Sequence, residues 1–280
     1  MTQNANPLKQ FFRQPALYLN LPSAGEFWDN GTLEIPPNKE LPVLPMTAMD
    51  EITYRTPDAL FNGSAVVNVI QSCVPAIKNA WAAPNMDVNS ILIAIRIASF
   101  GRELELESMC PNCGNQATYG TDLYSILEQI TTPDYKKSIK NGDLEIYFKP
   151  IDYKTQNDIG MKQFEQQRVL AQLPSADIPE EDKIKMVNEA MLEITKLTTV
   201  AITASIAGIK TPNSLVTESE FIGEFLENCD RKLYNEIKDH VIGMRQQGEI
   251  PPMKVTCTEC STQYEQGITM DQTNFFGTAS

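Results

Sequence analysis

The chain contains six cysteines, and four of them form two pairs with the spacing of metal ligands. Cys110 and Cys113 enclose Pro-Asn, and Cys257 and Cys260 enclose Thr-Glu. A two-residue gap in a tight turn, or knuckle, lets both sulfur atoms point at one ion, and two knuckles supply the four thiolates of a tetrahedral zinc site. The spacing therefore predicts a structural Zn²⁺ ion bound by all four cysteines. Four thiolates leave no open coordination position, so such an ion would not activate water.

Thiol redox chemistry is the alternative for these cysteines. Cys-Pro-X-Cys also occurs in thiol–disulfide oxidoreductases, whose first thiolate lies at a helix N-terminus. No helix signal follows Cys113, since residues 115–120 are polar and turn-like, and a second matched pair exists. Both observations favour zinc. The two other cysteines, Cys73 and Cys229, lie in apolar patterns, and we expect them to be buried free thiols.

The residues around the knuckles predict a zinc ribbon made of two hairpins. Residues 103–107 alternate between glutamate and leucine, as a half-buried strand does, and lead to the first knuckle. Residues 254–256 lead to the second in the same way, and Gly114 suits a backbone position with positive φ. From Gly114 to Thr256, 143 residues lie between the two pairs. The ribbon would therefore be split, with the metal joining two distant parts of the chain.

The first half of the chain changes from proline-rich to helical. Seven prolines in residues 1–50 exclude a mainly helical structure and predict a β-rich arm that lies on a neighbouring protein. Thr56 before Pro57 predicts a helix start. Helical patterns follow from Ser64 to about Ile77, and from an Asp87 N-cap to about Ser99. Because this last helix is apolar nearly all round, we expect it at the centre of a core.

The second half is predicted to be mostly helical. Asn141-Gly142 before an apolar run at 144–148 predicts a β-hairpin. From about Asp152 to Met244 the pattern is helical, and Thr217 with Glu220 predicts a capping box. His240 adjoins the last stripe and is expected to be an interior residue. Two apolar stripes are expected to face the core, with a groove for a partner helix as the alternative: Ile184, Val187, Met191, Ile194 and Leu197, and then Ile222, Leu226, Cys229, Leu233, Ile237, Val241 and Met244.

These patterns predict an α+β protein. It would have a mainly helical body, a β-rich N-terminal arm and a split zinc ribbon made of two distant Cys-X-X-Cys knuckles. Five segments are expected: an extended arm at 1–50, a helical core at 51–101, the first knuckle with a β-hairpin region at 102–150, a helical insertion at 151–250, and the second knuckle with a C-terminal tail at 251–280.

Composition narrows the possible functions. The 280 residues include 23 Lys and Arg against 36 Asp and Glu, a formal net charge of −13. Phosphate binding requires clustered cations, so nucleic acid is disfavoured as a partner, and basic or polar protein surfaces are favoured. No secretory signal is visible, and the apolar stretch at 91–98 is too short to span a bilayer, so we expect no membrane contact and synthesis in a cytoplasm. No phosphate loop, nucleophile elbow or His-Glu-X-X-His motif occurs, so no enzyme activity is expected.

A set of motifs carries a resemblance that composition and periodicity do not show: Phe12–Pro15, Leu21–Gly25, Pro45–Glu51, Thr56–Leu60, Ser72–Pro75, Ile93–Ala98 and Cys110–Cys113. In this order they resemble the baseplate hub proteins of T4-like contractile-tailed bacteriophages, most densely over residues 8–115. The resemblance implies a structural or assembly component of the baseplate hub. It implies other baseplate and tail proteins as partners, a possible homo-oligomer, and a location in the virion after assembly in the host cytoplasm. A zinc-ribbon module that binds nucleic acid and a thiol redox protein are the alternatives.

Overall fold

The computed structural model describes residues 6–56, 59, 62–175, 178–268 and 275–276. Helices and antiparallel strands are mixed within them, which confirms the predicted α+β class. The chain divides into two compact units. Unit 1 comprises Met1–Ala80, Asp87–Ile130 and Ile250–Ser280, and unit 2 comprises Trp81–Met86 and Thr131–Glu249. In sequence, most of unit 2 is therefore inserted between the two cysteine pairs.

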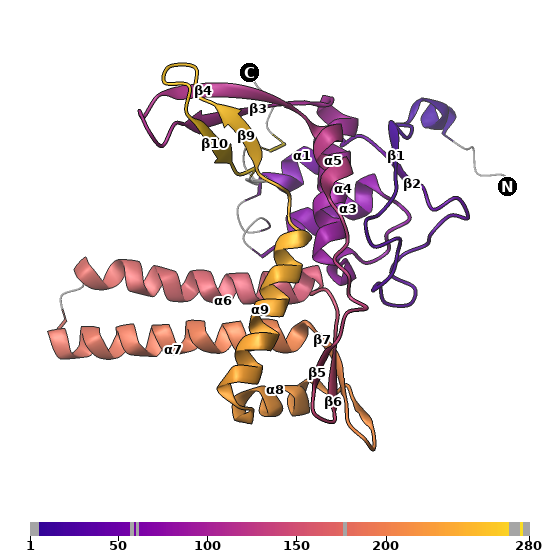
Figure 1. Cartoon of the computed structure of the whole chain (residues 1–280). Coiled ribbons are helices and arrows are strands. Elements are labelled where there is room, and N and C mark those ends of the chain that lie inside the picture. Colours follow the sequence, from indigo (N-terminus) through magenta and orange to yellow (C-terminus); the bar gives the residue numbers. More distant parts are fainter. Residues whose placement is uncertain (1–5, 57–58, 60–61, 176–177, 269–274, 277–280) are drawn as a thin grey trace. The chain divides into compact units, whose positions relative to one another are not determined.

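Unit 1 combines short helices with three two-stranded sheets. No helix among the described residues of the whole chain is both long and apolar enough to span a membrane. The elements of unit 1 are η1 (Pro7–Phe11), β1 (Leu17–Leu19), β2 (Leu41–Val43), α1 (Ala48–Tyr54), α3 (Ser64–Cys73), α4 (Asn85–Phe100), β3 (Glu103–Met109), β4 (Gln116–Asp122), α5 (Leu123–Gln129), β9 (Met253–Thr256) and β10 (Gln263–Gln266) (Figure 1). The first two residues of α4 and most of the preceding 3₁₀ turn η2 (Ala80–Ala82) are assigned to unit 2.

Helix α4 lies at the centre of the unit 1 core, as predicted. Ile91, Ile93 and Ile95 are each at most 1% exposed. The helix ends where Gly101 adopts a φ of 91°, a left-handed conformation that glycine enters at little cost. The preceding helix α3 ends at Cys73, four residues earlier than predicted, because Pro75 disfavours helical backbone at Val74.

Asp87 does not cap α4, contrary to the prediction, but lies inside its first turn and is fully buried. Its carboxylate accepts hydrogen bonds from the Ser23 N–H at 3.0 Å, the Ser23 hydroxyl, and Trp28 Nε1 at 2.7 Å. These bonds attach the proline-rich N-terminal region to the core helix. Of the helix predicted to start at Thr56, residues 57 and 58 lie outside the described residues.

Unit 2 is built on a four-stranded antiparallel sheet of order β5-β6-β7-β8. The predicted hairpin at Asn141-Gly142 is confirmed, and Gly142 has a φ of 57° in its turn. The predicted all-helical stretch from Asp152 is wrong at its centre, where two strands interrupt it. The elements are β5 (Ile139–Asn141), β6 (Leu144–Phe148), α6 (Tyr153–Gln172), η3 (Leu173–Ser175), α7 (Glu180–Ala204), β7 (Ile206–Lys210), β8 (Leu215–Val216), α8 (Ser219–Asn228) and α9 (Arg231–Gln247).

The second predicted stripe is divided between two helices. The helical pattern is interrupted at Cys229, where α8 ends. A new helix, α9, begins after Asp230, which caps it by accepting hydrogen bonds from the N–H groups of Lys232 and Leu233. Helix α8 has Glu218 as its N-cap residue, without a side-chain cap bond, so the predicted capping box is absent. The six other stripe residues are buried in one core cluster, as expected: Ile222, Leu226, Leu233, Ile237, Val241 and Met244.

The first predicted stripe is not core. Helices α6 and α7 lie side by side as a long hairpin (Figure 1), and α6 has no buried residue. On α7, Ile184 is 61% exposed and Met191 is 53% exposed, whereas Val187, Ile194 and Leu197 are half-buried. The prediction fails because the periodicity of a sequence identifies an amphipathic helix, but it does not show how much of the apolar face is covered by neighbouring elements.

Candidate metal centre

The four predicted ligands come together in unit 1. The Sγ atoms of Cys110, Cys113, Cys257 and Cys260 all lie within 4.8 Å of one another. Across the two hairpins, the Sγ atoms of Cys110 and Cys260 are 3.6 Å apart, as are those of Cys113 and Cys257. A tetrahedral site with Zn–S bonds of about 2.3 Å requires sulfur–sulfur distances of about 3.8 Å. A disulfide requires about 2.0 Å. The cluster therefore has the dimensions of a four-thiolate metal site and not those of disulfides.

Two antiparallel hairpins, β3–β4 and β9–β10, present the cysteines (Figure 1). The last pair of β3–β4 is Met109 with Gln116, and the corresponding pair of β9–β10 is Thr256 with Gln263. Each pair thus closes a six-residue loop whose first and fourth positions are cysteines. Residues 115–120 were predicted to be turn-like, but all of them except Asn115 belong to the strand β4 (Gln116–Asp122). Their side chains are only half-buried on one face, which leaves no apolar alternation in the sequence.

The two knuckles have the same backbone hydrogen bonds. In the first, the Cys110 N–H donates to the Asn115 carbonyl at 2.8 Å, and the Gly114 N–H donates to the Cys110 carbonyl at 2.9 Å. In the second, the equivalent bonds join Cys257 to Thr262 at 2.9 Å and Ser261 to Cys257 at 3.0 Å. These bonds direct both sulfur atoms of each knuckle to one side of its loop.

The residue after the second cysteine of each knuckle has a positive φ. Gly114 has a φ of 73°, as predicted, and Ser261 has a φ of 55°. A non-glycine residue in this region is uncommon because its Cβ atom crowds the backbone. Ser261 therefore adopts the same backbone conformation as Gly114, at some cost in conformational energy. Alignment of the two knuckles places Ser261 opposite Gly114, so the positive φ of Ser261 could have been predicted from the sequence.

Polar side chains join the two hairpins around the cysteines. Asn112 donates from Nδ2 to the Thr262 hydroxyl at 3.2 Å and lies 3.6 Å from Cys260 Sγ. Tyr119 donates its hydroxyl to the Thr256 carbonyl at 3.1 Å, and the hydroxyls of Ser108 and Tyr264 are 2.9 Å apart. These contacts could not be predicted from local sequence patterns, because each joins residues more than 130 positions apart.

The thiols have unequal proton affinities. Hydrogen bonds from the Thr262 and Asn112 side chains lower the pKa of Cys260 to about 5. The backbone N–H of Cys260 lowers the pKa of Cys257. The Asn115 N–H favours the thiolate of Cys113, but hydrogen bonds with Cys260, Cys257 and Cys110 outweigh it and raise the pKa of Cys113 to about 12. Four thiolates at these distances repel one another, so a bound divalent cation is what allows all four to lose their protons. The donor set fits zinc in this respect.

The cluster lacks the feature on which thiol oxidoreductases depend. In those proteins a helix N-terminus stabilises the attacking thiolate. Here both knuckles lie in loops between strands, and each is followed by another strand.

The remaining candidates do not belong to the cluster. Cys73 is fully buried, as expected, and burial raises its pKa to about 12. Cys229 is half-buried at the end of α8. The His240 ring lies 4.5 Å from the Phe148 ring, and burial lowers its pKa. Arg13 Nη1 lies 3.7 Å from Cys73 Sγ, but none of the three residues belongs to the cysteine cluster.

Comparison with known protein families identifies the family of the chain, which the geometry of the cluster does not. The family described as "T4 bacteriophage base plate protein" matches residues 39–277. The chain belongs to this family. The matched part contains all four clustered cysteines and the whole of the segment inserted between them. Comparison with curated proteins and with solved structures finds no significant match.

Proposed function

We propose that the chain is a non-catalytic structural or assembly component of the baseplate hub in a contractile phage tail, and that it binds one structural zinc ion. The observation that carries the role is the family match over residues 39–277. The observation that supports the metal is the convergence of four sulfur atoms within 4.8 Å. Its partners are other baseplate and tail proteins, and further copies of the chain. It is assembled in the host cytoplasm and ends in the virion tail.

Zinc would be held by Cys110, Cys113, Cys257 and Cys260 and would act as a cross-link between the two hairpins. The protein residues bring the four sulfur atoms together, and Asn112 and Thr262 favour the thiolate form of Cys260. In this proposal the two hairpins form a split zinc ribbon. With four thiolate ligands the ion has no position for a substrate, which agrees with a structural role.

The five predicted segments describe how the chain would be used. The first 50 residues would form the N-terminal arm, whose exposed residues 6–12 would contact a neighbouring protein, and 51–101 would form the helical core. Segments 102–150 and 251–280 would supply the two knuckles, and 151–250 would be the helical insertion. The exposed apolar residues of α7 support a contact between this insertion and another baseplate protein.

Two alternatives have weaker support. A ribbon that binds nucleic acid needs cations on its surface, whereas the two hairpins carry Glu103, Glu105, Glu107, Asp122, Glu259 and Glu265 against Lys254. A thiol redox protein needs a helix N-terminus beside the first cysteine, and strands follow both knuckles. Salt-dependent DNA binding by the purified chain would support the first alternative. A thiol count unaffected by chelator would support the second.

The test of the role is a phage that lacks this protein. Its lysate should contain normal heads and replicated DNA but defective or missing baseplates in electron micrographs. Normal contractile particles would reject the role. The metal is tested separately, since elemental analysis of the purified chain should find one zinc per chain, and a metal-free chain would reject it. Mass spectrometry of purified virions would show whether the protein remains in the particle.

A further inference from the structure

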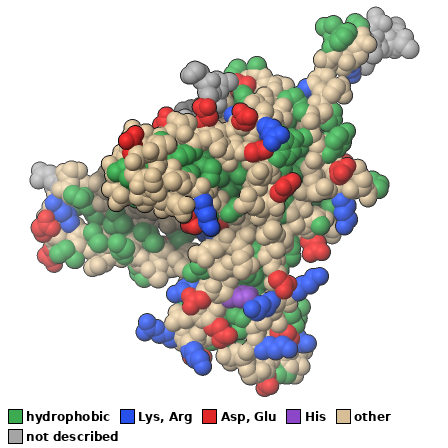
Figure 2. Space-filling view, turned by 45° about the horizontal axis from the view of Figure 1, so that its top comes forward, with side chains coloured by type: hydrophobic (Ala, Val, Ile, Leu, Met, Phe, Trp, Pro, Cys, Tyr) green, Lys and Arg blue, Asp and Glu red, His purple; other side chains and the backbone are tan. Residues whose placement is uncertain are grey.

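The N-terminal segment, residues 6–12, carries large apolar side chains that are exposed among the described residues of its unit. Asn6 caps the turn by accepting a hydrogen bond from the Leu8 N–H, and Pro7 occupies the first position of η1. No residue of η1 is buried, and Leu8, Phe11 and Phe12 are 61%, 76% and 55% exposed. The segment stands away from the rest of unit 1 (Figure 1), with hydrophobic side chains on its surface (Figure 2). It is a formed turn that offers two adjacent phenyl rings to solvent.

Arg13 fixes the direction in which this segment leaves unit 1. Its guanidinium donates to the Pro45 carbonyl at 2.6 Å, to Asp50 Oδ2 at 3.0 Å, and to the carbonyl and hydroxyl of Ser72, both at 2.8 Å. These acceptors come from three separate segments, so the chain is held firmly at residue 13. The rings of Phe11 and Phe12 therefore project from a fixed point beside Pro45.

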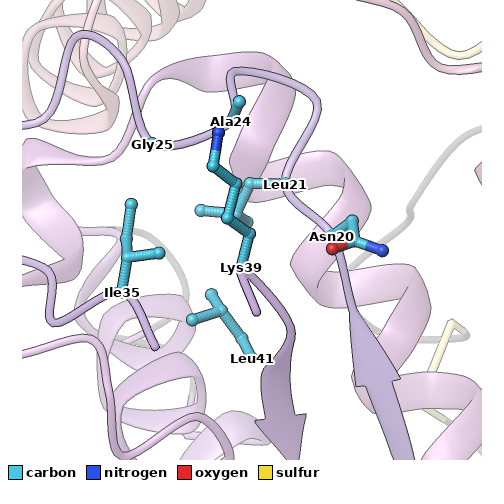
Figure 3. Close-up of a pocket in the computed structure, with 7 residues that line it drawn as sticks. All are labelled: Asn20, Leu21, Ala24, Gly25, Ile35, Lys39 and Leu41. Carbon is cyan, nitrogen blue, oxygen red and sulfur yellow. The ribbon is translucent and has the colours of Figure 1, made fainter. Parts of the chain in front are cut away.

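Unit 1 also has an apolar pocket, at the opposite end of the β1–β2 hairpin. Leu21, Ile35 and Leu41 surround the space, and the Lys39 side chain runs along it toward Ala24 (Figure 3). The cavity measures about 150 Å³. Apolar cavities of about this volume in proteins accommodate benzene, so the pocket has room for one phenyl ring. The ammonium of Lys39 would lie over such a ring in a cation–π contact.

The backbone around the pocket is held in left-handed conformations. Ala24 and Lys39 have φ values of 53° and 61°, and both are non-glycine residues that line the pocket. Non-glycine residues in this region store strain, and such strain is concentrated at binding sites. Gly25 is also favoured at its position, because its φ of 84° is a left-handed conformation that a residue with a Cβ atom adopts only with strain. The shape of the pocket therefore depends on three unusual backbone positions.

The segment cannot reach the pocket of its own chain. β1 and β2 pair with Leu17 opposite Val43 and Leu19 opposite Leu41, so Asn20 and Leu41 lie at one end of the hairpin. Arg13 is bound to Pro45 at the other end. The eight residues from Phe12 to Asn20 span about 26 Å when extended, and the short turn before Arg13 cannot fold back over that distance. The exposed phenyl rings and the pocket thus lie at opposite ends of the β1–β2 hairpin. A head-to-tail contact between copies of a chain requires such an arrangement.

The charges of the two regions are complementary. Residues 6–13 carry Lys9 and Arg13 and no carboxylate. Residues 20–41, which form the pocket, carry Glu26, Asp29, Glu34 and Glu40 against Lys39. Glu34 and Arg13 also take part in ion pairs within the chain, with Lys78 and Asp50. In a chain of net charge −13, a basic segment that meets an acidic loop is a pairing that another copy of the same chain can supply.

We propose that Phe11 or Phe12 of one copy inserts into the pocket formed by Leu21, Ile35 and Leu41 of the next copy. The contact is heterologous, so it generates a ring if the rotation between copies closes and an open filament if it does not. The inserted ring displaces water from the apolar walls and lies beside Lys39, while Lys9 faces the carboxylates of the acidic loop. This contact involves neither the cysteines nor the metal, so its failure would leave the zinc proposal unaffected.

The test uses two variants of the full chain that disable opposite halves of the contact. Phe11→Asp with Phe12→Asp removes the ligand, and Ile35→Trp fills the pocket from a side chain that is already 40% exposed. In sedimentation experiments up to about 100 µM, a range suited to weak contacts, the wild type should form oligomers. Each variant alone should remain monomeric. An equal mixture of the two should form dimers and nothing larger, because one chain retains only the pocket and the other only the ligand. Phe221→Ala removes an equally exposed ring from α8 and should associate as the wild type does.

The mixture distinguishes loss of the contact from misfolding. A misfolded variant would present neither a working pocket nor a working phenyl ring, so it would not dimerise with the other variant. A wild type that stays monomeric, or a mixture that does not dimerise, would overturn the proposal. Photo-crosslinking from benzoylphenylalanine at position 11, with one copy isotopically labelled, should join this position to residues 20–41 of the other copy. Crosslinks that form only within one chain, or only to a different tail protein in an infected-cell lysate, would also overturn it.

Discussion

Replacement of Cys257 and Cys260 by serine removes both proposed metal ligands of the second knuckle and leaves the first knuckle unchanged. Apart from the cysteines, the hairpin that carries this knuckle is attached to the first hairpin by a few polar contacts and has little apolar surface to bury. Val255 is the buried residue of β9, and β10 has none. A two-stranded hairpin without a hydrophobic face is marginally stable by itself. We therefore expect the double variant to lose both the metal and the attachment of residues 250–268 to the first hairpin.

The size of the effect depends on which loop the metal closes. A cross-link that closes a loop of about 145 residues, from the first knuckle to the second, raises the free energy of unfolding by about 5 kcal/mol through the entropy of the unfolded chain. A cross-link that closes only the four residues of one knuckle contributes about 2 kcal/mol. For a chain of this size the corresponding falls in melting temperature are roughly 10–20 °C and roughly 4–8 °C.

The measurement is thermal unfolding of the wild type with and without chelator, of the double variant, and of Cys229→Ser, which removes a half-buried thiol outside the cluster. Limited proteolysis read by mass spectrometry locates the destabilised residues. We expect the chelator and the double variant to give the same large shift, and Cys229→Ser to give a small one. If the double variant resembles Cys229→Ser, or if cleavage stays after Pro252, the metal is a local clip and the loop-closure argument is wrong.

Three smaller perturbations test separate features. Asp87→Ala should cost about 2–3 kcal/mol in denaturant unfolding, because the buried donors of Ser23 and Trp28 lose their acceptor. Burial raises the pKa of Asp87, so the folded state holds this proton to a higher pH than the unfolded state. Its contribution to stability should therefore fall as the pH rises through that raised pKa, and Asp87→Asn should abolish this slope; an unchanged slope would contradict the assignment. Gly114→Ala should cost about 1 kcal/mol, a purely conformational effect since no atom lies within 4 Å of the added Cβ. Asp230→Ala should cost about 1 kcal/mol through the lost cap of α9, and a neutral result would mean that the break before α9 has another cause.

Local signals predicted the features that depend on neighbouring residues. The Cys-X-X-Cys spacing identified the four cysteines that come together, although nothing in the sequence measured the distances between them. Asn141-Gly142 identified its hairpin, and the unbroken apolar pattern at 91–98 identified the core helix. In each case residues a few positions apart determine the backbone conformation or the burial of the segment, and no contact with a distant residue overrides this local preference.

Several of the failures involve partners that are distant in sequence. Asp87 has the position of an N-cap, but Ser23 and Trp28, about 60 residues earlier, make it a buried acceptor. The strand β7 was hidden in a helical pattern because its main partner, β6, lies before the two long helices, and β8 in turn pairs with β7. The break at Cys229 could have been found, since Asp230 is a good N-cap residue within an otherwise regular stripe.

Closure of the chain by a metal has a topological consequence. With zinc bound, the backbone from Cys113 to Cys257 becomes a ring with two tails, and the inserted unit belongs to the ring. A single cut anywhere in that ring leaves the two fragments joined, so the chain would survive a nick as one particle until the metal is removed. The entropy of closing a ring rises only by about 0.6 kcal/mol for each doubling of its length. The insertion is therefore the part of the chain that can gain or lose whole helices with the smallest effect on the stability of unit 1.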